Sequence, residues 1–156
     1  MVGEIESSFP KLQTAAYRIT SAASRDYNCI AWAAGDSRRW WWPEDDPDND
    51  AIYWPVGVAH EESLNAFVAA FALLGYLPCD NETPELGVEK VAFFADAGSI
   101  PTHAARQLPS GRWTSKLGFL EDIEHDLHDV AGEAYGTVAV VLKRPLLPVS
   151  GSAPVS

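Results

Sequence analysis

The hydrophobic pattern of this chain changes from a helical repeat to strand-length runs about half-way along its length. Over residues 60–76, apolar side chains recur at the spacing of one helix face, which predicts a core helix. From residue 88 onward the apolar residues come in short runs, several of them bounded by turn-forming residues. A helical first half followed by strands predicts an α+β fold.

The second half of the chain contains the runs that predict a sheet. Residues 91–94 form a short apolar run that is typical of a buried strand. Residues 103–108 and 112–117 are joined by Pro109-Ser110-Gly111, which predicts an antiparallel hairpin. Residues 136–142 are apolar on both faces, so we expect a central strand there.

Further helices are expected outside these runs. Apolar residues share one helical face over 120–130, which predicts a second helix of some length. A weaker helical stripe follows Pro10, a residue that starts helices well. The sequence predicts one domain over residues 1–144 and a loose tail, rich in Pro, Ser and Gly, over 145–156.

Length and charge limit the classes of protein that this chain can belong to. With 156 residues, 47% of them hydrophobic, the chain can bury its own core. A net charge of −11 argues against a nucleic-acid partner and against an anionic membrane. The first residues lack the basic and apolar regions of a signal peptide, so we expect a cytoplasmic protein, with export by a signal-independent route as the open alternative.

Cys29 stands where a short helix is expected to begin. Asn28 is a good N-cap, residues 29–34 are largely apolar, and Gly35 can end the helix. A helix N-terminus favours a thiolate, and its backbone N–H groups can stabilise an oxyanion. The alternative is that Cys29 is a small buried apolar residue, as free cysteines often are.

The order of these elements resembles that of papain-like cysteine hydrolases. A helix that begins with Cys29, a core helix and a hairpin whose first strand opens with His103 together resemble the NlpC-like peptidases and CHAP-type amidases, over about residues 17–142. The resemblance implies a nucleophile helix packed on an antiparallel sheet. It also implies that Cys29 is the nucleophile and His103 the general base, with an orienting residue on the next strand.

The sequence departs from that family pattern at two positions. The orienting position falls on Ser115, where the family usually has His or Asn, and Asn28 precedes the nucleophile where the family often has Asp. A serine hydroxyl can accept a hydrogen bond from His103 but lends no charge to an imidazolium. Lys116 could lower the pKa of Cys29 if it turned inward, whereas an outward, solvated lysine is the alternative.

An unusual aromatic segment follows the helix of Cys29. Over residues 38–54 the chain carries four tryptophans, and we assign them to substrate binding together with Asn28 and Lys116. They are Trp40, Trp41, Trp42 and Trp54. Aromatic side chains can wall a cleft and stack on a sugar or peptide. Alternatively, they cover the core beneath a long loop.

Metal and cofactor sites are not expected. Asp46, Asp48 and Asp50 have the spacing that starts a calcium loop, but the required Gly and the closing Glu are missing. His125 and His128 are expected on the polar face of the second helix, where solvation explains them. Cys79 belongs to no pair with the spacing of zinc ligands.

The sequence therefore predicts a cysteine-dependent amide hydrolase, namely a peptidase, amidase or deamidase, that uses a Cys–His pair without a cofactor. Its partner would be a peptide or amide substrate. The alternative is an inactive binding or regulatory module of the same fold, which would hold a protein partner through the Trp-rich segment 38–54. A toxin-like effector would share the first mechanism and differ only in its target.

Overall fold

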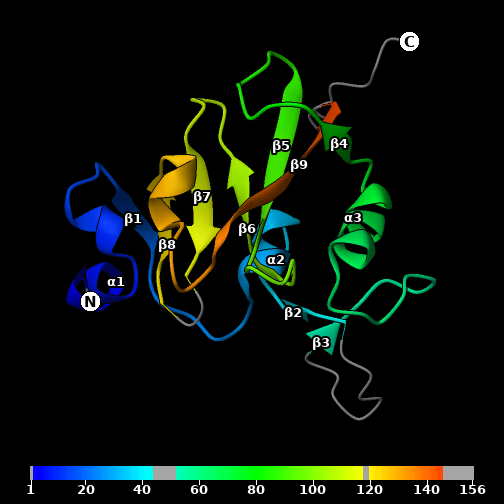
Figure 1. The fold of residues 1–156 in the computed structure, drawn as a ribbon, viewed down its shortest axis with the longest axis horizontal. Helices are drawn as coiled ribbons and strands as arrows, with labels where there is room; N and C mark the ends of the chain where they lie inside the picture. The colour runs from blue at the N-terminus through cyan, green and yellow to red at the C-terminus, as the bar shows by residue number, and fades with distance from the viewer. Residues whose placement is uncertain (1, 44–51, 118–119, 146–156) are drawn as a thin grey trace.

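A seven-stranded antiparallel sheet forms the centre of the molecule (Figure 1). The structure is a computed structural model that describes residues 2–43, 52–117 and 120–145. The strand order is β1-β8-β7-β6-β5-β9-β4, and β2 pairs with β3 in a separate parallel ribbon. This arrangement confirms the predicted α+β class. The elements are α1 (Val2–Ser8), η1 (Pro10–Gln13), β1 (Arg18–Ser21), α2 (Cys29–Ala33), β2 (Trp40–Trp41), β3 (Ile52–Tyr53), α3 (Leu64–Ala72), β4 (Leu77–Cys79), β5 (Val88–Ala95), β6 (Pro101–Gln107), β7 (Trp113–Lys116), β8 (Asp122–His125), η2 (Leu127–Val130) and β9 (Thr137–Pro145).

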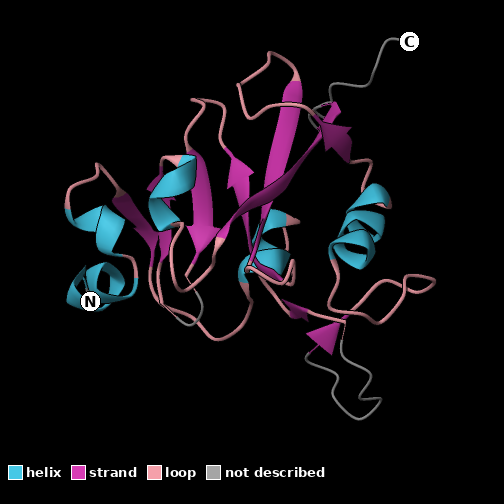
Figure 2. Cartoon of the chain, viewed as in Figure 1, coloured by secondary structure: helices cyan, strands magenta, loops and turns pink. Residues whose placement is uncertain are grey.

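Helices cover both faces of the sheet, as Figure 2 shows. One face carries α2, α3 and the β2–β3 ribbon, and we call its packed interior the α2–α3 core. The large members of this core are Ile30, Trp41, Trp54, Phe67, Phe71, Tyr76, Phe93 and Leu142. The other face carries α1, η1 and η2, and its interior is the α1 core. The large members of that core are Ile5, Phe9, Leu12, Phe94, Trp113, Leu117, Ile123, Leu127 and Val130.

The central strands show why the sheet is buried on both sides. Successive side chains of a strand point to opposite faces. Along β5, Phe93 packs into the α2–α3 core and Phe94 into the α1 core. The apolar run that predicted a central strand is β9, which lies between β5 and β4. Only its middle is buried, with Leu142 in the α2–α3 core and Val141 in the α1 core, so the strand is apolar on both faces there.

The prediction of a second long helix over 120–130 is wrong. The segment forms strand β8 and the short 3-10 helix η2. β8 pairs with β7 on one side and with β1 on the other, so backbone hydrogen bonds to both neighbours replace the intrahelical ones. Ile123 and Leu127 are buried in the α1 core, but as parts of a strand and a 3-10 turn.

Other helices also differ from their predicted ranges. The core helix α3 begins later than expected, because the hydroxyl of Ser63 accepts a hydrogen bond from the N–H of Ala66 and caps it. The stripe after Pro10 yields only the 3-10 helix η1, and the chain then enters β1. Helix α1 was not predicted. None of the helices in the described ranges is long and apolar enough to cross a membrane.

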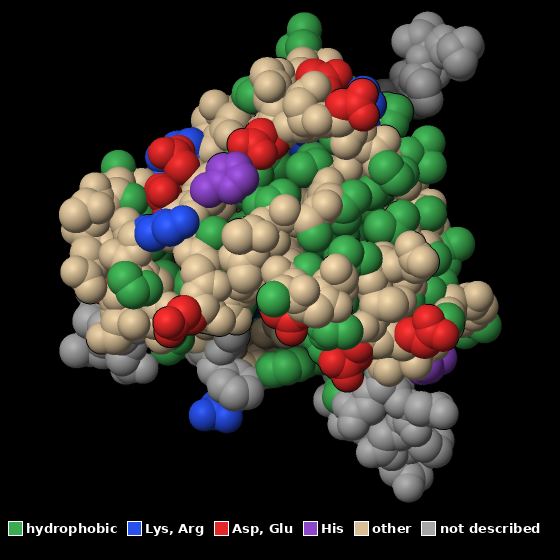
Figure 3. Space-filling view, in the orientation of Figure 1, with side chains coloured by type: hydrophobic (Ala, Val, Ile, Leu, Met, Phe, Trp, Pro, Cys, Tyr) green, Lys and Arg blue, Asp and Glu red, His purple; other side chains and the backbone are tan. Residues whose placement is uncertain are grey.

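The charge of the chain is visible on its surface. On the face shown in Figure 3, acidic side chains are spread over several elements, whereas Lys and Arg stand at isolated places. Several of the basic side chains are engaged with carboxylates. For example, Arg112 bonds to both Glu124 and Asp126 at 3.0 Å. A surface of this kind presents no basic field to an anionic partner on the face shown.

Candidate active site

Asn28 fixes the start of the short helix α2. Its side-chain oxygen accepts hydrogen bonds from the N–H of Ala31 at 3.0 Å and of Trp41 at 3.1 Å. Its amide nitrogen donates to the carbonyl oxygen of Trp41 at 2.9 Å. An aspartate could not supply this last donor. The asparagine therefore caps α2 and ties it to β2, which places Cys29 at the first helical position, as expected.

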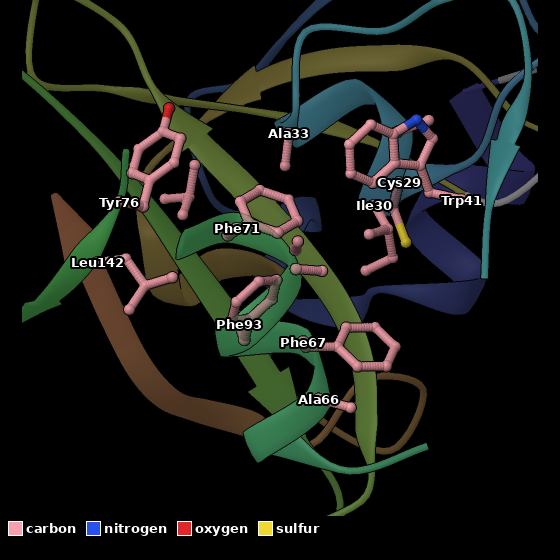
Figure 4. Packing of buried hydrophobic residues seen from close by; sticks show 14 of the residues in the cluster. Cys29, Ile30, Ala33, Trp41, Ala66, Phe67, Phe71, Tyr76, Phe93 and Leu142 are labelled. Atoms are coloured by element: carbon pink, nitrogen blue, oxygen red, sulfur yellow. The ribbon is translucent and has the colours of Figure 1, made fainter. Parts of the chain in front are cut away.

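Cys29 lies at the wall of a cavity of about 330 Å³. Trp40, Trp42 and Ile52 form the apolar part of the lining, and Thr102 and Tyr135 contribute polar groups. Cys29 itself is 9% exposed. Figure 4 shows it beside Trp41, at one margin of the α2–α3 core. A largely apolar cavity with a few polar groups at its wall is the usual form of a ligand site.

The four tryptophans assigned to substrate binding have two different roles in the structure. Trp40 and Trp42 line the cavity. Trp41 packs against Phe71, and Trp54 packs against Phe67, both inside the α2–α3 core. Trp40 and Trp42 therefore line a cavity, as a substrate-binding role requires, whereas Trp41 and Trp54 cover the core as in the alternative; substrate binding itself stays a prediction.

Burial controls the protonation of Cys29. Loss of solvation raises the pKa of its thiol to about 11, although the N–H groups of Ala104, Ile30 and Cys29 and the charge of Lys116 all act in the opposite direction. The expected thiolate at the helix start is therefore not formed near neutral pH. The backbone dipoles of a five-residue helix are outweighed by the cost of burying the anion.

His103 and Ser115 are brought together by β6 and β7, as the sequence predicted. Nε2 of His103 lies 2.9 Å from Oγ of Ser115. The same Oγ lies 2.7 Å from Nε2 of His125 on β8, and Nδ1 of His125 lies 2.7 Å from the carbonyl oxygen of Asp126. All three side chains are fully buried. Burial lowers the pKa of both histidines, to about 4 for His125.

Sequence reasoning missed His125 because it assigned this segment to a helix. Alternation was the available signal: in a strand, His125 and Ile123 share a face, so a buried Ile123 implies a buried His125. His128, its supposed helical neighbour, is exposed and pairs instead with Glu82 at 2.9 Å. The two histidines therefore do not form a pair.

Tyr135 was also missed, and it joins His103 to the cavity. Its ring stacks on the imidazole of His103 with centroids 3.9 Å apart and an angle of 6°. The hydroxyl of Thr102 donates to its carbonyl oxygen, and the flanking Gly132 and Gly136 close its loop with two backbone hydrogen bonds of 2.9 and 2.7 Å. Burial raises its pKa, and a charge on Cys29 would raise it further.

The side chains of Cys29 and His103 lie on opposite faces of the sheet, near the start of β6. Cys29 lies on the side of α2, beside the N–H of Ala104. The imidazole of His103 packs against Phe94 and Tyr135 on the side of α1. Among the described residues, no hydrogen bond joins Cys29 to His103, and the buried Nδ1 of His103 has no partner. The backbone ladder between β6 and β7 pairs Arg106 with Thr114 and Gln107 with Trp113, and ends before it reaches His103.

Lys116 points inward, so the solvated alternative is wrong. Its side chain is fully buried, and Nζ donates to the carbonyl oxygen of Leu120 at 2.5 Å and lies 5.4 Å from the ring centre of Tyr27. Burial lowers its pKa, while the neighbouring charges of Asp122, Cys29 and Glu121 raise it. Tyr27 donates in turn to Asp122 at 2.6 Å. A positive charge therefore lies near Cys29, balanced mainly by Asp122.

The described residues hold no group of three or more His, Cys, Asp and Glu side chains that could bind a metal ion. The acidic run with Asp46, Asp48 and Asp50 lies outside those residues. Cys79 is a second free thiol, and its Sγ donates to the carbonyl oxygen of Asn81 at 3.3 Å.

A family model matches residues 18–143, which include every element from β1 to β8 and most of β9. The chain belongs to this family, described as a domain of unknown function (DUF7689). The matched range holds Cys29, His103, Ser115 and His125, whereas helices α1 and η1 precede it. No curated protein and no solved structure matches the chain.

Proposed function

We propose that this protein is a cysteine-dependent amide hydrolase in which Cys29 is the nucleophile and His103 the general base, in a papain-like arrangement. One observation carries the proposal. The imidazole of His103 is fully buried and held at Nε2 by Ser115, while its Nδ1 has no partner among the described residues. A buried polar atom without a partner is costly in a fold and calls for an explanation, of which a catalytic role is one.

At rest the thiol of Cys29 and the imidazole of His103 are both neutral, and proton transfer between them is uphill, because burial raises the pKa of the thiol and lowers that of the imidazole. Because burial lowers the pKa of His103, the ring is uncharged near neutral pH and can accept a proton. Because burial raises the pKa of Cys29 to about 11, the thiol keeps its proton until a base removes it. The pair would therefore act by general-base catalysis on a bound substrate, not as a preformed ion pair.

The reaction would proceed in two stages. Nδ1 of His103 takes the proton of Cys29 while Sγ attacks the amide carbonyl, with the N–H of Cys29 donating to the oxyanion. The C–N bond then breaks as His103 returns the proton to the leaving amine, which leaves a thioester. Water hydrolyses the thioester with the same base and releases the acid.

In the resting structure Cys29 and the imidazole of His103 lie on opposite faces of β6, and no hydrogen bond among the described residues joins them. The mechanism therefore requires a movement at the start of β6, beyond the end of its ladder with β7, that brings Sγ and Nδ1 within reach when substrate fills the cavity. Catalytic hydrogen bonds that are long at rest and tighten in the complex are common in hydrolases. Trp40 and Trp42, which line the cavity next to Cys29, are the groups that a substrate would contact first.

Alkylation of Cys29 tests the pair directly. In a Cys79→Ala background, Cys29 is the only thiol of the chain, and iodoacetamide labelling can be followed by mass spectrometry. We expect His103→Gln to slow labelling near neutral pH by about tenfold or more, because the base is lost. The exposed His128→Gln is the matched control and should leave the rate unchanged.

One labelling result would contradict the Cys–His pair. If Cys29 reacted equally fast with and without His103, and if its rate rose in proportion to hydroxide until a pKa of about 11, the thiol would be an isolated buried group. The Cys–His hypothesis would then be abandoned.

A second candidate is a binding module of the same fold. The burial of Cys29 and the absence of its hydrogen bond to His103 favour this reading, and the aromatic cavity would hold the ligand. Two variants separate the candidates. Cys29→Ala would abolish turnover in a hydrolase, whereas Trp40→Ala, and not Cys29→Ala, would weaken binding in a module of the second kind.

A further inference from the structure

We propose that His125, anchored by the carbonyl oxygen of Asp126, sets the tautomer of His103 through the hydroxyl of Ser115 and so keeps Nδ1 of His103 free to accept a proton. This inference deepens the proposed function and rests on it for its catalytic consequence. The tautomer itself follows from the hydrogen bonds alone. In this scheme His125 is a positioning residue, because its contact with the reacting atoms is indirect.

The first step is the bond between His125 and Asp126. A carbonyl oxygen can only accept a hydrogen bond. Because Nδ1 of His125 lies 2.7 Å from the carbonyl oxygen of Asp126, this nitrogen must carry the hydrogen. The backbone thus determines which ring nitrogen of His125 is protonated.

The second step is the state of the other nitrogen. Burial lowers the pKa of His125 to about 4, partly opposed by Asp126 and reinforced by the charge of Arg112. The ring is therefore neutral near neutral pH, and with the hydrogen on Nδ1 its Nε2 can only accept. The hydroxyl of Ser115, 2.7 Å away, must donate to it.

The third step concerns which atom donates in the hydrogen bond between Ser115 and His103. Once the single hydrogen of the Ser115 hydroxyl points to His125, its oxygen can only accept at the remaining contact. Nε2 of His103, 2.9 Å from that oxygen, must then donate. In a neutral ring the hydrogen on Nε2 leaves Nδ1 with a lone pair, and Nδ1 is the atom without a partner.

Burial protects these hydrogen bonds from competing partners. His103, Ser115 and His125 are fully buried, so solvent does not compete for any of the three contacts. The rings of Phe94 and Tyr135 pack against His103 and offer it no side-chain hydrogen bond. A serine alone could donate or accept, and would leave His103 in either tautomer. Because the hydroxyl of Ser115 donates to His125, it can only accept from His103.

The test begins with the tautomer. In protein labelled with ¹⁵N-histidine, long-range ¹H–¹⁵N spectra identify the protonated ring nitrogen, and His→Gln variants assign the four histidines. We expect hydrogen on Nε2 of His103 and on Nδ1 of His125. A hydrogen on Nδ1 of His103 in the unmodified protein would overturn the inference without any variant.

Two variants then test the role of His125. His125→Phe frees the hydroxyl of Ser115 to donate to His103 as well as to accept from it, so a form of His103 with its hydrogen on Nδ1 should appear beside the Nε2 form. Ser115→Ala removes the link, and both tautomers of His103 should appear. An unchanged His103 spectrum in a folded His125→Phe or Ser115→Ala protein would show that the chain of hydrogen bonds does not act. His128→Phe is the control and should change nothing at His103.

Labelling of Cys29 separates this inference from the proposed function. If the Nδ1 form appears in His125→Phe and labelling slows with the loss of the Nε2 form, both stand. If the Nδ1 form appears but the labelling rate does not change, the positioning role of His125 in the structure stands and the Cys–His mechanism fails. If labelling slows while the hydrogen stays on Nε2, the inference about His125 fails instead.

Discussion

At the scale of single residues, burial decides the chemistry of this protein more than the local backbone does. Cys29 begins a helix, which favours a thiolate, yet burial raises its pKa to about 11. His103 and His125 are kept neutral by the same effect. Cys29, His103 and His125 are therefore uncharged at rest, and reactivity would have to arise when substrate is bound.

The neutral His125 predicts a dependence of stability on pH. An unfolded histidine takes up a proton near pH 6.5, whereas folded His125 does so only near 4. The folded state therefore loses stability as pH falls from 6.5 toward 4, by about 3 kcal/mol for this group. His125→Gln should reduce this slope in urea unfolding at several pH values within the window. Equal slopes in both proteins would contradict the prediction, and the exposed His128→Gln should behave like the unmodified chain.

At the scale of elements, one short loop places the aromatic ring that stacks on His103. The loop between η2 and β9 is closed by backbone bonds between Gly132 and Gly136, and it holds Tyr135 against the ring of His103. Gly136 has a positive φ of 73°, and a Cβ there would collide with the carbonyl oxygen of Ala95 on β5. Glycine is therefore required at this position for two reasons: its positive φ, and the close approach of its Cα to the backbone of Ala95.

Gly136→Ala should displace Tyr135 and weaken the fold. We expect a loss of unfolding free energy of more than about 2 kcal/mol, because backbone strain and a backbone collision add. Gly57→Ala is the matched control, since Gly57 also has a positive φ, 89°, but has open space at its Cβ position. It should lose only about 1 kcal/mol. Denaturant unfolding measures both, and equal losses would show that the approach to Ala95 is unimportant.

At the scale of the whole molecule, one sheet separates two cores. The α2–α3 core supports the cavity, because Phe67 packs against Trp42, which lines it. The α1 core encloses Ile123 of β8. It lies beside the buried side chains of His103, Ser115 and His125, which are joined by hydrogen bonds. Its cover includes Phe9 and Leu12, which lie before the range that the family model matches. Both faces must therefore be packed for the candidate site to form.

The separation of the two cores predicts additive mutations across the sheet. Phe67→Leu in one core and Leu12→Val in the other should each lower the free energy of unfolding by about 1 kcal/mol. The double variant should show their sum within about 0.5 kcal/mol, with a single transition. Phe67→Leu combined with Phe93→Leu is the contrast, because these rings touch, with centroids 5.8 Å apart, and their effects should couple. Strong coupling across the sheet, or two transitions, would contradict this picture.

The sequence by itself determined the elements whose signals are local. Asn28 and Gly35 bracket the helix of Cys29, and Pro109-Ser110-Gly111 joins β6 to β7, the two strands that carry His103 and Ser115. These signals act through neighbours a few residues apart, so a pattern can reveal them. The apolar run of β9 likewise predicted a strand with neighbours on both sides, and its Val141 and Leu142 are buried in the two cores.

Only the tertiary structure decided the rest of the candidate site. The apolar spacing over 120–130 suits a helix, but pairing with β1 and β7 makes its first part a strand and turns His125 toward Ser115. The stacking of Tyr135 on His103 and the burial of Cys29 depend equally on segments far apart in the chain. Such contacts gain their free energy from burial and from hydrogen bonds between distant segments, which local periodicity does not encode.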